Sequence, residues 1–169
     1  NLMNGDIQVE SAPNKGTKIT VTVYLKIQEN EKEQEKELLD LPVLVVDDDK
    51  TCCESTVATL QEIGIAGEWV LTGKEAVERC AARHKTGHDY FAVILDWEMP
   101  EMDGIATARR IRECVGEDVT IIILTSFDFS EIEEEARAAG VNAFMAKPLL
   151  RSRLTATLRQ LKKEKKEKN

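Results

Sequence analysis

The sequence has no apolar run long enough to cross a membrane. Its longest runs are PVLVV, AVILD and VTIIIL, which have the length of strands rather than the roughly 20 residues of a membrane helix. The start, NLMNGDIQVE, lacks the basic residues and apolar stretch of a secretory signal, so we expect a cytoplasmic chain without membrane contact. Because the chain begins at Asn1, we also expect a piece of a longer protein, whose other parts would carry any membrane anchor.

The four cysteines lack the spacing of a metal or redox site. They form no CxxC pair and no Cys/His cluster, and a cytosolic chain uses such cysteines mostly as small apolar side chains. Basic residues are also outnumbered, since 31 Asp and Glu face 23 Lys and Arg, and the net charge of −8 would repel a phosphate backbone. Neither a cysteine metal centre nor nucleic-acid binding is therefore expected.

The first 27 residues predict a β-hairpin. Apolar and polar residues alternate in two runs that are separated by PNKG, and the apolar positions are Ile7, Val9, Ile19, Val21, Val23 and Leu25. An isolated hairpin is marginally stable in water, so its apolar face should pack against something else. Residues 28–40 then carry six acids and two lysines, which indicates a charged linker.

From residue 41 to residue 169 the pattern predicts one α/β domain. Strands are expected at 43–47, 65–70, 91–96, 119–125 and 143–146, with helical patterns between them. The pattern of the last helix puts Leu150, Leu154, Leu158 and Leu161 on one side, and the final KKEKKEKN reads as a frayed end. Strict alternation implies a doubly wound parallel sheet of five strands, covered by helices on both faces.

Polar residues stand where four of these strands end. The first strand runs into Asp47, Asp48 and Asp49, and the other three end at Asp96, at Thr125 and at Lys147. Each alone has a simpler explanation, because an acid or hydroxyl after a strand is often the N-cap of the next helix. For Asp96 that explanation is weak, since WEMPEMDG intervenes and Asp103 is the better cap. In an open parallel sheet the carboxyl ends form the binding edge.

Such a cluster suits metal-assisted phosphoryl transfer. Neighbouring carboxylates repel one another and attract a hard divalent cation, of which Mg²⁺ is the first choice. A carboxylate can itself accept a phosphoryl group. The added charge would then require a metal on one side and a cation such as Lys147 on another, with Thr125 donating a hydrogen bond.

These residues resemble the receiver domain of response regulators, the phosphoacceptor module of two-component signalling. The resemblance covers about Leu41 to Leu161 and rests on VLVVDDD, VILDWEMPEMDG, IIILTS and FMAKPL, in that order. It implies a flavodoxin-like (βα)5 fold in which an aspartate takes a phosphoryl group from a phosphohistidine. The partner would be a histidine kinase or a histidine phosphotransfer domain, and the receiver would promote its own phosphotransfer and dephosphorylation.

The resemblance also implies a role for each site residue. Asp96 would be the phosphoacceptor, and Asp47 and Asp48 would hold Mg²⁺ together with Asp96 and the backbone carbonyl of Glu98. Thr125 would be the switch hydroxyl, Phe144 the switch aromatic and Lys147 the phosphate clamp, followed by a cis bond to Pro148. From the residues alone, Asp49 could replace one acid of the pair, and the Glu98 side chain could alter the lifetime of the phosphoryl group.

The hairpin is similar to the last strands of the ATP-binding domain of sensor histidine kinases. The sequence has no glycine-rich nucleotide loop and no phosphoacceptor histidine motif, and His84 and His88 lie in RHKTGHDY, which reads as a solvated helix end. The combination implies the C-terminal part of a hybrid sensor kinase that cannot itself bind ATP as a kinase does. A homodimer is conceivable through the hairpin or through the face of the fourth helix, fifth strand and fifth helix.

Two other functions fit parts of the pattern. A haloacid-dehalogenase-like phosphatase also uses an aspartyl nucleophile at a strand end, but it needs a second aspartate two residues later, where this chain has Glu98. A receiver that never takes phosphate could serve as an interaction module. Hydrolysis of a small phosphate ester with turnover would favour the first alternative, and failure to bind Mg²⁺ would favour the second.

Overall fold

The computed structural model describes residues 5–13, 16–23, 38–126, 130 and 132–168. The chain divides into two units, residues 1–32 and residues 33–169. Leu25, which we predicted in the hairpin, and residues 28–37 of the predicted linker lie outside the described residues. The two units are treated separately below.

The first unit contains an antiparallel hairpin of β1 (Gly5–Ala12) and β2 (Gly16–Val23), as predicted. Ile7 pairs with Val21, and Val9 pairs with Ile19, so these four apolar side chains share one face. Their exposed fractions are 59–66%. Within the described residues, the apolar face of the hairpin is therefore not covered.

The second unit contains a parallel sheet of five strands in the order β4-β3-β5-β6-β7. The strands are β3 (Pro42–Val46), β4 (Ala66–Val70), β5 (Ala92–Asp96), β6 (Thr120–Thr125) and β7 (Ala143–Ala146). Within this unit the chain starts at β3, next to one edge, moves to β4 at that edge, and then crosses back over β3 to β5, β6 and β7. The predicted fold class is confirmed, and each strand agrees with its predicted range to within one residue at either end.

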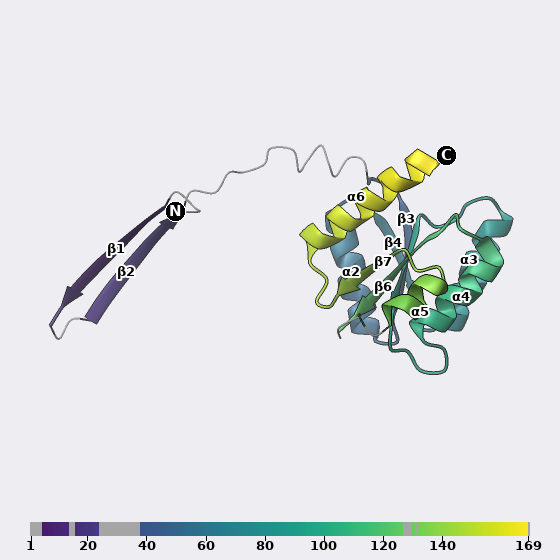
Figure 1. Ribbon diagram of the computed structural model, residues 1–169, viewed down its shortest axis with the longest axis horizontal. Helices are drawn as coiled ribbons and strands as arrows, with labels where there is room; N and C mark the ends of the chain where they lie inside the picture. The colour runs from purple at the N-terminus through teal and green to yellow at the C-terminus, as the bar shows by residue number, and fades with distance from the viewer. Residues whose placement is uncertain (1–4, 14–15, 24–37, 127–129, 131, 169) are drawn as a thin grey trace. The chain divides into compact units, whose positions relative to one another are not determined.

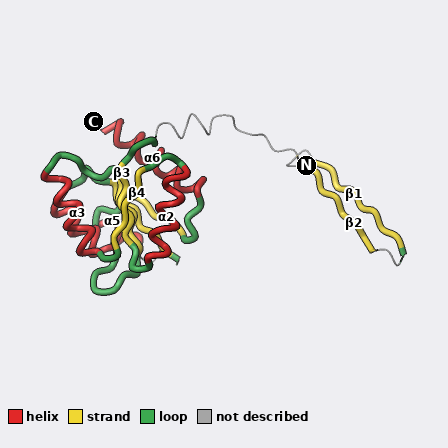
Figure 2. The backbone as a smooth tube through the Cα atoms, turned by 180° about the vertical axis from the view of Figure 1, so that it is seen from behind, coloured by secondary structure: helices red, strands yellow, loops and turns green. Residues whose placement is uncertain are grey.

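Helices cover both faces of the sheet (Figures 1 and 2). They are α2 (Lys50–Glu62), α3 (Gly73–Lys85), α4 (Gly104–Val115), α5 (Glu133–Ala138) and α6 (Arg151–Lys168). Figure 1 shows α2 and α6 on one face and α3, α4 and α5 on the other. The buried apolar residues accordingly form two clusters, one on each face.

Burial on both faces explains why the central strands are apolar except at their ends. Every residue of β5 and β6 is buried, whereas the edge strand β4 alternates between exposed and partly buried positions up to Val70. The side chains of one strand alternate between the two clusters, so that Val93 and Leu95 belong to one cluster and Ile94 to the other. The sheet is thus a rigid support for the loops at its carboxyl edge.

The end of α6 corrects one prediction. The helix continues to Lys168 instead of fraying after Leu161, because Lys165 takes the next position on its packing side. The Lys165 ammonium lies 5.4 Å from the centre of the Phe91 ring and donates a hydrogen bond to the Asp118 carbonyl. The prediction that Leu150 shares the apolar side of the last helix is also wrong, since Leu150 precedes α6 and is 58% exposed.

Candidate functional site

The polar strand ends meet at the carboxyl edge of the sheet. The Lys147 ammonium lies 2.8 Å from a carboxylate oxygen of Asp47 and 2.8 Å from one of Asp96. Asp47 follows β3, Asp96 ends β5 and Lys147 follows β7. Along the chain, Asp47 precedes Asp96 by 49 residues and Lys147 by 100 residues. The predicted acids and the predicted cation therefore belong to one site.

Three carboxylates at this edge could hold a metal ion. One oxygen from each of Asp47, Asp48 and Asp96 can be chosen so that all three lie within 4.8 Å of one another. Asp47 and Asp96 are buried, and Asp48 is exposed. An oxygen donor set open on one side suits Mg²⁺, which usually keeps several waters in its coordination shell.

Asp49 differs from the two acids before it, because its side chain caps a helix. Its carboxylate accepts a hydrogen bond from the backbone N–H of Thr51 at 2.7 Å and caps the N-terminus of α2. This hydrogen bond is the main reason why the pKa of Asp49 is lowered. The backbone N–H of Asp49 in turn donates to Asp47 at 2.9 Å. Asp47 and Asp48, and not Asp49, are the acids that lie together with Asp96 in the carboxylate cluster.

The surroundings of Asp96 oppose its charged form. Burial raises the pKa of Asp96 above its ordinary value, and the negative charges of Asp47 and Asp48 act in the same direction. The hydrogen bond and the charge of Lys147 lower it again, but only in part. For Lys147, burial alone would lower the pKa, yet hydrogen bonds with Asp47 and Asp96 raise it overall. The ammonium therefore stays charged at neutral pH.

Thr125 and Phe144 lie on the two strands beyond Asp96. Thr125 is the last residue of β6 and is 1% exposed, while Phe144 lies in β7 and is partly buried. The guanidinium of Arg137 lies over the Phe144 ring at 5.8 Å from its centre. Glu98 has an exposed side chain in the loop after β5, and the bond between Lys147 and Pro148 is cis, as expected.

Gly104 has a structural role that the sequence reasoning missed. A Cβ at this position would lie 2.5 Å from the backbone oxygen of Asp96, so only glycine allows the start of α4 to lie directly behind the acidic residue. The N–H of Gly104 donates to the Trp97 carbonyl at 2.9 Å, and Asp103 caps the helix as predicted. The signal in the sequence was the glycine that follows this cap.

A groove beside the site was also missed. It has a volume of about 530 Å³ and lies between α2 and the segment after β7, with Cys52, Thr56, Thr59, Leu124, Pro148 and Leu149 among its lining residues. Lys147 lines the same groove. Residues on α2 are thus close enough to the acidic site to contact a molecule that reaches it.

Comparison with known proteins identifies the family of this chain. The model of the response regulator receiver domain matches residues 43–159. The chain belongs to the response regulator receiver family. It is therefore a receiver domain of two-component signalling, preceded by a hairpin.

Two solved receiver structures illustrate the similarity. The Vibrio cholerae chemotaxis protein CheY4 is 26% identical, with a TM-score of 0.65 over 72% of this chain and 98% of CheY4. The receiver domain of the Pseudomonas aeruginosa sensor histidine kinase PA1611 is 28% identical, with a TM-score of 0.64 over 72% of this chain and 97% of that domain. That structure has a magnesium ion coordinated in its active-site cleft. Receiver domains bind Mg²⁺ there, and the acidic cluster of this chain is compatible with it.

Hybrid kinases are among the similar sequences. Hybrid signal transduction histidine kinase L of Dictyostelium discoideum is 30% identical over 93% of this chain, and the sensor kinase/phosphatase LuxQ of Vibrio cholerae is 25% identical over 99%. The chain spans only 10% and 20% of the length of these two relatives. Among the described residues, no helix is long and apolar enough to cross a membrane.

Proposed function

We propose that this receiver accepts a phosphoryl group on Asp96 from a phosphohistidine of a histidine kinase or phosphotransfer domain. The observation that carries the proposal is the contact of Lys147 with both Asp96 and Asp47, beside a third carboxylate. A nucleophilic oxygen, a cation for the transferred group and a set of metal ligands then lie at one edge. We further propose that the reaction takes place in the cytoplasm.

Each residue has a defined part in this reaction. A carboxylate oxygen of Asp96 attacks phosphorus in line with the leaving imidazole nitrogen, so that the P–O bond forms as the P–N bond breaks. Asp47, Asp48 and Asp96 would hold Mg²⁺ together with the carbonyl of Glu98, and the ion would neutralise phosphoryl oxygens. Lys147 would move from the free carboxylates to the phosphoryl group. Because burial, Asp47 and Asp48 oppose negative charge at Asp96, the greater charge of an aspartyl phosphate would have to be neutralised by the metal and by Lys147.

The switch would involve the strands next to Asp96. In this proposal the Thr125 hydroxyl turns toward the new phosphoryl oxygens, and Phe144 turns inward into the space that becomes free. The change would shift an existing equilibrium at α5, β7 and α6. The small contact area of α5 supports such a movement, since within its six residues only Ala136 is buried.

The N-terminal hairpin belongs, in our proposal, to the ATP-binding domain of a parent hybrid kinase. Its four exposed apolar side chains support this assignment, because the rest of such a domain would cover them. Similarity to hybrid kinases over more than nine tenths of the chain also supports it. Without that domain, the chain could pair through the hairpin or through α5, β7 and α6. Sedimentation of the whole chain and of residues 28–169 distinguishes the two: a dimer that persists without the hairpin excludes the hairpin as the interface.

Phosphorylation tests the main proposal directly. We expect the chain to gain one phosphoryl group from acetyl phosphate or phosphoramidate with Mg²⁺, detected by intact-protein mass spectrometry. Asp96→Asn should abolish the added mass, whereas Asp89→Asn, on the opposite edge of the sheet, should not. Labelling that persists in Asp96→Asn would overturn the assignment. Repeated hydrolysis of a small phosphate ester would favour the phosphatase instead.

The metal ligands require a second measurement. Asp48→Ala removes one proposed oxygen donor, so we expect the affinity for Mg²⁺ to fall at least tenfold in a titration followed by the fluorescence of Trp97, next to Asp96. Asp49→Asn is the matched control, because asparagine keeps the helix cap and removes one charge. Equal losses in both variants would mean that the titration reports net charge and not ligation.

A further inference from the structure

The segment that follows Asp96 runs against the start of α3. We call residues 97–103, between β5 and α4, the acceptor loop. Gly73 is the first residue of α3 and is buried where α3 and α4 lie side by side (Figure 1). A Cβ on Gly73 would collide with Oγ1 of Thr107 in α4, and it would lie 3.3 Å from both the carbonyl oxygen and the sulfur of Met102 in the loop. The backbone of α3 therefore contacts both the acceptor loop and the first turn of α4.

Thr107 connects this contact to the ends of the loop. It is fully buried, and its hydroxyl donates a hydrogen bond of 2.7 Å to the carbonyl of Asp103, the last loop residue. The backbone N–H of Thr107 donates to the same carbonyl at 2.9 Å. Gly104, which comes next, donates its N–H to the carbonyl of Trp97, the first loop residue, at 2.9 Å. The first turn of α4 thus holds both ends of the loop.

The backbone within the loop requires such support. Glu101 has a φ of +65°, in the left-handed region that residues with a side chain rarely adopt. A strained conformation of this kind persists only where the surrounding structure enforces it. The N–H of Met102 donates to the carbonyl of Pro100 at 2.7 Å, and Met102 is also the loop residue that lies against Gly73. The contact with α3 therefore lies next to the strained position.

The start of α3 is a fixed support for this contact. Thr72 caps the helix by accepting a hydrogen bond from the N–H of Glu75 at 3.2 Å, and Ala76 and Cys80 are buried in the core. All atoms that a Cβ at position 73 would press against belong to the acceptor loop or to the first turn of α4. A side chain added there would therefore displace the loop rather than α3.

We propose that Gly73 is a positioning residue for the phosphorylation of Asp96. Because Gly73 has no side chain, α3 can approach the acceptor loop and hold it in place. Glu98, whose backbone carbonyl would bind Mg²⁺ in the proposed reaction, belongs to this loop, so a displaced loop would move a metal ligand away from Asp96. The effect on phosphorylation rests on the proposed function, whereas the position of the loop can be measured without phosphate or metal.

Hydrogen exchange in the metal-free chain measures the position of the loop. The N–H of Gly104 is protected by its bond to Trp97, so a displaced loop exposes it to exchange. We expect Gly73→Ala to accelerate this exchange, followed by NMR, about tenfold more than the exchange of the amides of β5 and β6, which report global unfolding. An equal acceleration of all these amides would mean that the substitution only lowers global stability, and it would overturn the proposal.

Phosphorylation by acetyl phosphate with Mg²⁺ measures the consequence for the reaction. We expect Gly73→Ala to lower the initial rate of labelling of the folded protein about tenfold, because a small displacement around a reacting atom has a large effect on rate. Thr107→Ala removes the oxygen that the new Cβ would meet, so in that variant the same substitution should change the rate by less than about twofold. Gly87→Ala, just beyond the other end of α3 and without a neighbouring atom, should leave the rate unchanged.

These measurements distinguish the role of Gly73 from the proposed function. A wild type that takes no phosphoryl group would refute the proposed function, and the exchange of the Gly104 N–H would then decide alone whether Gly73 positions the loop. A labelled wild type and an equally fast Gly73→Ala would overturn the role of Gly73. An equal loss of rate with and without Thr107→Ala would also overturn it, because the loss would then not come from this contact.

Discussion

The two edges of the receiver sheet are both rich in charge, but they use it differently. At the carboxyl edge, Asp47, Asp48 and Asp96 gather around a single ammonium, that of Lys147. At the amino edge, Arg112 donates to the carbonyls of residues 116, 119 and 140 and to the Asn142 side chain, at distances of 2.6–3.1 Å. One edge carries an excess of negative charge, and the other matches donors to fixed acceptors.

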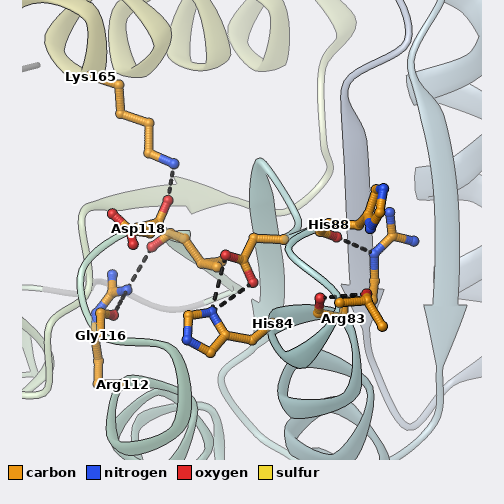
Figure 3. Close-up of polar contacts among 10 residues, drawn as sticks. Arg83, His84, His88, Arg112, Gly116, Asp118 and Lys165 are labelled. Atoms are coloured by element: carbon orange, nitrogen blue, oxygen red, sulfur yellow. Dashed lines mark hydrogen bonds and ion pairs between the residues drawn. The ribbon is translucent and has the colours of Figure 1, made fainter.

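The carboxyl edge is a surface that can exchange ligands, whereas the amino edge is not. Each acceptor of Arg112 lies between α4 and β6 or between α5 and β7, so the guanidinium fixes where these strands begin. Figure 3 shows Arg112 beside Gly116, the first of these acceptors. The carboxylates of the other edge are close enough to repel, which favours the binding of a cation or the loss of a charge. A fixed amino edge therefore allows changes at the carboxyl edge without loss of the fold.

Arg112→Met should have the largest effect on stability. Methionine keeps much of the apolar stem but removes the donor of the partly buried Val119 and Gly140 carbonyls, and such acceptors cost free energy when they lose a partner. It also removes the exposed contacts with the Gly116 carbonyl and the Asn142 side chain, of which the latter still accepts from the Ile121 N–H. We expect the free energy of unfolding in urea to fall by about 3 kcal/mol. Arg109→Met is the matched control, because its exposed pair with Glu135 should contribute less than about 1 kcal/mol. Equal losses would refute the assigned role.

Gly140→Ala tests the same edge from the other partner. Gly140 has a φ of +84°, and a Cβ there would lie 2.6 Å from Nε of Arg112. We expect a loss of about 2 kcal/mol from strain and displacement of the guanidinium. Gly87→Ala measures the cost of backbone strain alone, because Gly87 also has a positive φ but no atom within 4 Å of a new Cβ. It should cost about 1 kcal/mol, and a cost as large as that of Gly140→Ala would mean that backbone strain explains both.

The two edges also differ in how far the sequence predicts them. The carboxyl edge was predictable, because strand ends in a parallel sheet converge and Asp47, Asp96 and Lys147 each follow an apolar run. The contacts of Arg112 were not, since its acceptors are mostly backbone carbonyls, which every residue has. Lys165 was missed for a related reason: in KKEKKEKN nothing distinguishes the one lysine that packs on Phe91. The cap at Asp49 required knowledge of where β3 ends.

At the carboxyl edge, Asp96→Asn should stabilise the fold. It removes one of three neighbouring negative charges, and the gain from lower repulsion and desolvation should exceed the lost pair with Lys147, since the balance of these effects raises the pKa of Asp96. We expect the free energy of unfolding at pH 7 to rise by about 1 kcal/mol. Asp89→Asn, where the acid pairs with His84 at the amino edge, should not stabilise.

The pH dependence identifies the cause of this gain. With a pKa above the value of 3.8 expected for the unfolded chain, Asp96 keeps its proton in the folded state at pH values where the unfolded chain has lost it. The stability of the wild type relative to Asp96→Asn therefore falls as pH rises from 3.8 through the raised pKa, and the difference stays constant above it. Urea unfolding of both proteins between about pH 4 and pH 7 measures this difference. A difference independent of pH would mean that the substitution acts through packing, and a less stable Asp96→Asn would mean that the pair with Lys147 outweighs the repulsion.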